Sequence, residues 1–163
     1  MNLKGRVAAR LVELGLTLPP VFQPVANYVG HRLQGPHLQG QHLWIAGMGP
    51  TWAQAVHHAG KLGGTVSLED GIKAARLTAL NMLAQAAEAL DGDLDRIAGC
   101  LKVFVLVNAR PDFIDAHRVA DGVTDQLVEV LGDIGRPVRS AIAAPSLPLD
   151  ISTEADALFL LHS

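Results

Sequence analysis

Val138-Arg-Ser-Ala-Ile-Ala-Ala144 and, after a short turn, Thr153-Glu-Ala-Asp-Ala-Leu-Phe-Leu-Leu161 are the two segments that decide the fold. Both have the apolar content and the length of β-strands, and the proline-containing segment Leu147–Asp150 predicts a turn between them. Side chains alternate along a strand, so Arg139 leaves the first strand on one definite face. The unit therefore fixes the direction of a permanent cation.

Two carboxylates, Glu154 and Asp156, lie on the second strand among apolar residues. Because they are two residues apart, both leave the sheet on the same face, and we predict that they share one cavity with Arg139. Arginine binds carboxylates bidentately and neighbouring carboxylates move protons, so such a cavity would suit a small organic acid. An ordinary cross-strand ion pair on a solvated face also fits this spacing, and that alternative stays open.

The composition predicts a single domain over residues 1–163 with subunit interfaces, because 49% of the residues are hydrophobic and only 18% are charged. The net charge of −3 and the scattered basic residues argue against nucleic acid as a partner. No apolar run approaches the ~18 residues of a membrane span, so we expect no membrane partner. A lone cysteine, Cys100, favours a cytoplasmic location.

Periodicity along the chain predicts the order α, ββ, α, β, α, ββ, which favours an α+β fold with two main helices packed on one face of a mixed sheet. Apolar residues at helical spacing predict a short helix over 3–15, within an N-terminal extension that covers residues 1–20. A hairpin is expected next, with a turn over 35–40. The other predicted elements are strands over 27–34 and 41–46, a helix over 67–90, a strand over 97–107, a helix over 111–131, and strands over 138–144 and 153–161.

Backbone N–H groups near Gly47 and Met48 are candidate substrate contacts, because glycine allows close approach. A simple turn at the end of a strand explains the same glycines equally well. Ser140 has no histidine placed by a recognisable motif, so a nucleophilic triad is not supported. We expect no metal and no cofactor. One cluster of histidines is a candidate metal site, but its spacing fits no common zinc signature: His31, His37 and His42.

This pattern of motifs resembles the Rid family, the reactive intermediate or imine deaminases that include endoribonuclease L-PSP-like proteins. The likeness covers about residues 27–161, and the longer N-terminus is similar to a bacterial subgroup with a chorismate-mutase-like fold. The residues that carry it are Arg139-Ser140, Leu147-Pro148-x-Asp150, Glu154-Ala-Asp156, Tyr28, Ala46-Gly-Met-Gly-Pro50 and Lys102-Val-Phe-Val.

The resemblance implies a homotrimer with a central β-barrel, whose ligand clefts draw residues from two chains. It further implies a cofactor-independent hydrolase that converts 2-imino or enamine acids to 2-oxo acids and ammonia. By position, Arg139 would hold the substrate carboxylate, Asp156 would handle water or a proton beside Glu154, and Tyr28 would line the cleft.

Departures from the family pattern leave a second function open. Ala141 stands where many deaminases have a cysteine, and Asp156 replaces a longer glutamate. Asp121, aligned with a family asparagine, adds negative charge near a cleft meant for an anion and would weaken carboxylate binding by Arg139. The alternative is a regulatory trimer that binds small carboxylates without catalysis, while the acidic net charge disfavours ribonuclease activity.

Overall fold

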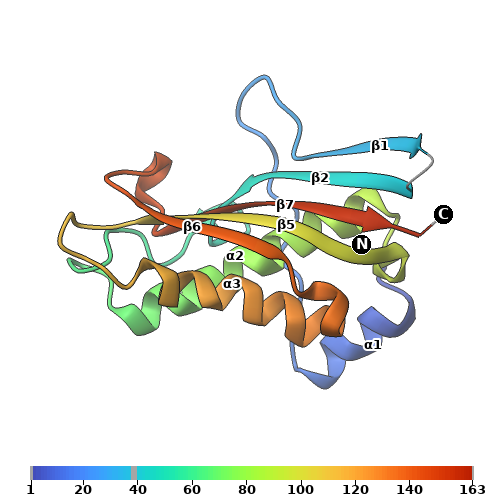
Figure 1. Ribbon diagram of the computed structural model, residues 1–163, viewed down its shortest axis with the longest axis horizontal. Helices are drawn as coiled ribbons and strands as arrows, with labels where there is room; N and C mark the ends of the chain where they lie inside the picture. Colours follow the sequence, from blue (N-terminus) through green and yellow to red (C-terminus); the bar gives the residue numbers. More distant parts are fainter. Residues whose placement is uncertain (1, 38–39, 163) are drawn as a thin grey trace.

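The computed structural model describes residues 2–37 and 40–162. Within these residues, a mixed five-stranded sheet forms one layer and helices cover one of its faces (Figure 1). The strand order is β1-β2-β7-β5-β6, and all neighbours are antiparallel except the parallel pair β5 and β6. The elements are α1 Gly5–Glu13, β1 His31–His37, β2 Gly40–Met48, β3 Thr51–Trp52, β4 Ala55–Val56, α2 Leu68–Ala89, β5 Ile97–Asn108, α3 Ala116–Leu131, β6 Val138–Ala144 and β7 Thr153–Leu161.

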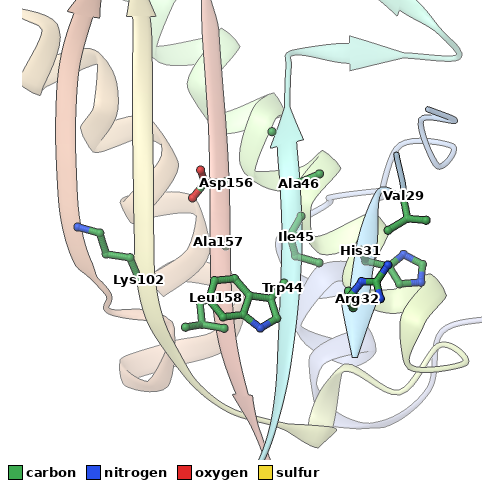
Figure 2. A pocket seen from close by; sticks show the side chains of 11 residues that line it. Val29, His31, Arg32, Trp44, Ile45, Ala46, Lys102, Asp156, Ala157 and Leu158 are labelled. Carbon is green, nitrogen blue, oxygen red and sulfur yellow. The ribbon is translucent and has the colours of Figure 1, made fainter. Parts of the chain in front are cut away.

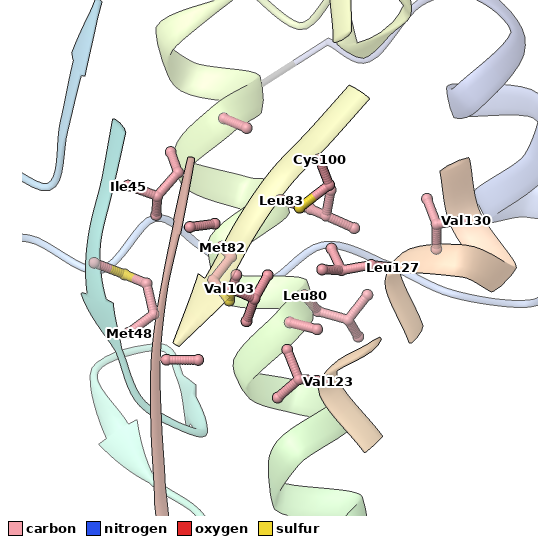
Figure 3. Close-up of a cluster of buried hydrophobic side chains, with 14 of the residues drawn as sticks. Ile45, Met48, Leu80, Met82, Leu83, Cys100, Val103, Val123, Leu127 and Val130 are labelled. Carbon is pink, nitrogen blue, oxygen red and sulfur yellow. The ribbon is translucent and has the colours of Figure 1, made fainter. Parts of the chain in front are cut away.

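The hydrophobic core lies between the sheet and the helices. Val103 and Val105 of β5 are fully buried, whereas Lys102 and Phe104, which alternate with them, are only partly buried. Alternation along a strand assigns the valines to the helix side and the other two residues to the uncovered side. Side chains of both long helices pack around the valines (Figure 3): Leu80, Met82, Leu83, Val123 and Leu127.

The long helix α2 begins where the sequence places its cap. The hydroxyl of Ser67 accepts a hydrogen bond of 3.1 Å from the backbone N–H of Asp70, which satisfies one free donor of the first turn. Helix α3 packs closely against α2 at Gly122, where a Cβ atom would lie 2.6 Å from the carbonyl oxygen of Ile72. Glycine is therefore required at this crossing.

Most predicted elements are confirmed, including the last two strands and the long helix, but the first strand is shorter than predicted. It begins at His31 rather than at residue 27, because residues 25–28 form bends. Tyr28 consequently lies in a loop before the sheet. The turn predicted over 35–40 is wrong at its ends, because β1 runs through residues 35–37 and β2 begins at Gly40. Its middle residues, Leu38 and Gln39, lie outside the described residues.

The second long helix also begins later than predicted. Pro111 was expected to open it, but the backbone N–H of Phe113 bonds to the carbonyl of Arg110 and closes a separate turn there. The helix itself begins at Ala116, after Asp115. A proline that looks like a helix start thus belongs to the preceding loop.

The N-terminal helix α1 is part of the hydrophobic core. Val7 and Leu11 are buried, and the carboxylate of Asp95 accepts hydrogen bonds from the backbone N–H groups of Arg6 at 2.6 Å and Val7 at 2.9 Å. Asp95 thereby caps α1 from a distant part of the sequence. No helix in the described part of the chain is both long and apolar enough to span a membrane.

Candidate functional site

The uncovered face of the sheet carries an ordered set of polar and apolar side chains. Residues paired across neighbouring strands point to the same face, so the strand registers define rows across the sheet. One row runs through Arg32, Trp44, Leu158, Lys102 and Val138. The next row contains Asp156, Phe104 and Ser140.

A groove of about 530 Å³ lies over these rows. Its lining includes Trp44 and Leu158 on the floor, with Lys102 and Asp156 toward one end and Arg32 toward the other (Figure 2). The volume is in the range of small-molecule sites. A mostly apolar groove with a few charged groups is the arrangement that such sites share.

A β-bulge in β2 borders this groove. Ile45 pairs with Ala157 and Met48 with Ala155, so two residues of β2, Ala46 and Gly47, oppose the single residue Asp156 of β7. Bulges of this kind often redirect side chains next to active sites. The bulge therefore interrupts the β2–β7 ladder opposite Asp156, while both carboxylate residues keep their regular pairing with β5.

Gly47 gives the Glu154 carboxylate its space. A Cβ atom at residue 47 would overlap the Oε1 atom of Glu154, so the carboxylate lies directly over the glycine backbone. Among the described residues, no side-chain hydrogen bond or ion pair holds this carboxylate. The structure thus brings together two residues that the sequence predicted for the site.

Both carboxylates of β7 are harder to ionise than usual. Desolvation by burial, followed by repulsion from Asp156, raises the pKa of Glu154. Desolvation also raises the pKa of Asp156, while the Lys102 ammonium and the Phe104 backbone N–H partly oppose that rise. Perturbed carboxylates in a groove are candidates for proton transfer.

Lys102 is a site residue that sequence reasoning missed. Its Nζ atom donates a hydrogen bond of 2.7 Å to the Ser140 hydroxyl, which holds the ammonium on the uncovered face close enough to influence Asp156. The signal was present in the sequence, because Lys102 alternates with the buried valines of β5 and so had to point away from the core.

Arg139 lies on the other face of the sheet. Its cross-strand neighbour is the buried Val103, whose other neighbour is the buried Ala157, so the arginine points toward the helices. Its Nη1 atom donates to Asp121 Oδ1 at 2.8 Å and to Thr124 Oγ1 at 3.3 Å. The prediction that Arg139 faces one cavity with Glu154 and Asp156 is therefore wrong within one chain.

The negative charge expected from Asp121 near the cleft lies directly on Arg139, as an ion pair of 2.8 Å that neutralises part of the arginine charge. Thr124 adds a second acceptor from the same helix. Both acceptors engage Nη1, and the structure gives the Nε and Nη2 atoms no partner among the described residues. A bound anion could therefore still reach this guanidinium from outside.

Tyr28 and Met48 lie apart from the carboxylate pair. Tyr28 lines a different hollow, next to Gln85 and Glu88 of α2. The Met48 side chain is buried in the hydrophobic core, so only its backbone could contact a ligand (Figure 3).

Metal-binding and thiol chemistry find little support in the described residues. No group of three histidine, cysteine or acidic side chains there is arranged to hold a metal ion. Burial raises the pKa of Cys100 to about 12, so its thiol remains protonated and unreactive. The Nδ1–H group of His31 donates a hydrogen bond of 3.0 Å to Gln85 Oε1.

Comparison with known proteins assigns the family. The model of one family, described as "YjgF/chorismate mutase-like, putative endoribonuclease", matches residues 8–159. The chain belongs to this family. The match confirms the resemblance and the fold class expected from the sequence.

Relatives of the YjgF/chorismate mutase-like chain come from bacteria and from a protozoan. Protein TCP17 of Trypanosoma cruzi is 36% identical over 160 residues, which are 98% of this chain and 96% of that protein. The crystal structure of a protein of unknown function from Agrobacterium tumefaciens is 35% identical, with a TM-score of 0.86 over 96% of this chain and 92% of the other. An endoribonuclease-type protein from Shewanella oneidensis is 29% identical, with a TM-score of 0.89 over 96% of this chain and 100% of the other.

Proposed function

We propose that the chain is a cytoplasmic enzyme that hydrolyses 2-imino acids and their enamine tautomers to 2-oxo acids and ammonia. The observation that carries the proposal is the Glu154–Asp156 pair, which lies at a strand bulge beside a groove and has raised pKa values. A carboxyl group with a raised pKa exchanges protons closer to neutral pH than an ordinary one. Such a group can accelerate the proton transfers that hydrolysis of a C=N bond involves.

The reaction consumes one water molecule for each imine. Glu154 would accept a proton from the water as its oxygen bonds to the imine carbon, and the imine nitrogen takes up a proton. The C–N bond of this adduct then breaks, ammonia leaves, and the remaining hydroxyl loses its proton to become the carbonyl. General acid–base help of this kind contributes ~10²–10⁴-fold. Glu154 suits this role better than Asp156, because no side-chain hydrogen bond or ion pair within the described residues holds its carboxylate where it lies over Gly47.

Two chains must share one substrate if Arg139 anchors its carboxylate. Arg139 and Glu154 lie on opposite sides of the sheet, so they cannot reach one small molecule within a single chain. The uncovered face also exposes apolar side chains, including Val138 and Ile142, that a partner would cover. A homotrimer in which Arg139 of one subunit approaches Glu154 of the next meets both requirements.

The first test measures imine decay. Imino acids are generated in situ by an amino acid oxidase in the presence of semicarbazide, and the capture of imine is followed with and without the protein. We expect wild-type protein to outcompete semicarbazide, and Arg139→Ala and Glu154→Gln to lose this ability. Arg136→Ala is the matched control, because the part of the chain that the structure describes gives this exposed arginine a single ion pair, with Asp133. If wild-type protein does not change the capture of any imino acid by semicarbazide, the proposed enzymatic activity is refuted.

A mixing experiment tests the shared cleft. Arg139→Ala and Glu154→Gln chains, each inactive alone, are denatured together in equal amounts and refolded. In a cyclic trimer each cleft needs an intact Arg139 from one chain and an intact Glu154 from the next. Each requirement is met by half of the chains in an equal mixture, so about one cleft in four should be complete. Recovery of about a quarter of wild-type activity is expected, and no recovery from a mixture that refolds into mixed trimers would refute a cleft shared by Arg139 and Glu154.

The Arg139–Asp121 pair favours one other function. A guanidinium that is already partly neutralised suits a weak, reversible carboxylate site, as in a regulatory trimer. Oxo-acid binding that Arg139→Ala abolishes, without imine hydrolysis by wild-type protein, would select this alternative. Cleavage of RNA that survives Arg139→Ala would instead support the activity in the family description.

A further inference from the structure

The groove next to the carboxylate pair has an apolar floor that proton transfer does not require. Trp44 and Leu158 are direct cross-strand neighbours, and Trp44 is 48% exposed. The indole Nε1 atom donates a hydrogen bond of 3.1 Å to Gln34 Oε1, which fixes the direction of the ring. A fixed, half-exposed aromatic beside an aliphatic side chain is a preformed apolar surface.

This floor lies at a definite distance from the reacting groups. Leu158 is two residues after Asp156 on β7 and points to the same face, so the two positions are about 7 Å apart along the strand. The side chain of a leucine- or phenylalanine-like substrate spans much of that distance, whereas a methyl group does not. Glu154 lies two residues further from the floor, so a molecule whose imine carbon lies on the groove side of Glu154, next to Asp156, would reach Trp44 only with a long side chain.

The ends of the groove are cationic. Lys102 and Arg32 flank the Trp44–Leu158 pair within one row of the sheet (Figure 2). Cations at these positions repel a basic side chain and tolerate the negative charge of an acid. At the Lys102 end Asp156 lies beside the ammonium, so Arg32 at the other end is the cation that disfavours a lysine-like side chain on the floor.

We infer that this groove selects imino acids with a long apolar side chain, branched aliphatic or aromatic, which packs on Trp44 and Leu158. The inference rests on the proposed function, because it names the substrate class of the same site. A single methylene group in a hydrophobic pocket is worth about 10- to 200-fold in discrimination between substrates. The leucine-derived imine should accordingly exceed the alanine-derived imine in kcat/KM by a factor in this range.

Trp44→Ala and Trp52→Ala provide the test. Trp52 is 39% exposed, but it lies in the β3–β4 hairpin and does not line the groove, so it is a matched control. Trp44→Ala should lower the leucine-to-alanine ratio of kcat/KM about tenfold by removing apolar contact area. Trp52→Ala should leave the ratio unchanged. An unchanged ratio in Trp44→Ala, or a wild-type preference for the alanine-derived imine, would overturn the inference.

Calorimetric titration with product acids separates this inference from the proposed reaction. 4-Methyl-2-oxopentanoate should bind wild-type protein more tightly than pyruvate, and Trp44→Ala should lose the difference. If wild-type protein hydrolyses no imine but still binds 4-methyl-2-oxopentanoate more tightly than pyruvate, the proposed reaction is refuted and the assignment of the groove stands. Equal affinity for the two acids would overturn the assignment, as expected if a second copy of the chain fills the groove.

Discussion

Gly47→Ala is the substitution that should separate activity from stability most sharply. The backbone at Gly47 is not in the left-handed region, so alanine fits the local conformation. Its Cβ atom would overlap the Glu154 carboxylate and lie 3.1 Å from Cδ and 3.3 Å from Cγ of that side chain. The carboxylate must swing away, and nothing among the described residues opposes this movement with a hydrogen bond.

The two expected effects differ in size. Replacing glycine with alanine stabilises a compatible site by about 0.4–1 kcal/mol through the unfolded state, and the displaced side chain offsets part of that gain. The free energy of unfolding should therefore change by less than about 1 kcal/mol. If Glu154 transfers the proton, the rate of imine hydrolysis should fall by ~10²–10⁴-fold.

Urea denaturation and the semicarbazide competition, run on the same preparation, measure both quantities. Gly99→Ala is the control, because the nearest atom to its added Cβ lies 4.0 Å away. Gly47→Ala combined with Glu154→Asp should recover part of the rate, since the shorter side chain relieves the overlap. A Gly47→Ala enzyme with the wild-type rate would refute the role of Glu154, and a loss of several kcal/mol in stability would refute the geometry.

Two further predictions concern stability. Asp95→Ala should cost about 1–2 kcal/mol in the free energy of unfolding, because it removes the cap of α1, and chemical denaturation at fixed protein concentration measures this. Asp93→Ala, whose carboxylate has no partner among the described residues, should change little, and equal effects of the two would contradict the cap. Raised pKa values at Glu154 and Asp156 mean that the folded state binds more protons, so stability should fall as pH rises from their unfolded pKa values through the raised ones. Glu154→Gln with Asp156→Asn should flatten that decline, and an unchanged slope would show that these groups do not cause it.

Local patterns were sufficient to predict most elements of the fold. The Ser67 cap, the β-branched run of β5 and the turn before β7 are each specified by neighbouring residues, and each lies where predicted. The start of α3 was misplaced because Pro111 fits a helix start and a turn equally well, and only the bond from Phe113 to Arg110 decides between them.

The candidate site required information that local patterns lack. Alternation correctly predicted which residues share a face within β6 and within β7. Which face of β6 matches which face of β7 depends on β5, which lies between them. Val103 aligns Arg139 with Ala157 rather than with Asp156, and this register puts the cation and the acids on opposite faces. The groove over Trp44 and the bulge at Gly47 likewise arise from strand order and register, which no single segment encodes.

The bond between α1 and Asp95 sets an order of events during synthesis on the ribosome. Val7 and the acceptor that caps its helix are 88 residues apart in the chain. At 5–20 residues per second, that acceptor is made about 4–18 s after the helix. Throughout this interval the nascent helix exposes an apolar stripe with Val7 and Leu11, because neither the segment around Asp95 nor α3, on which it packs, has been made. Helix α1 thus docks only after a much later segment of the chain has emerged.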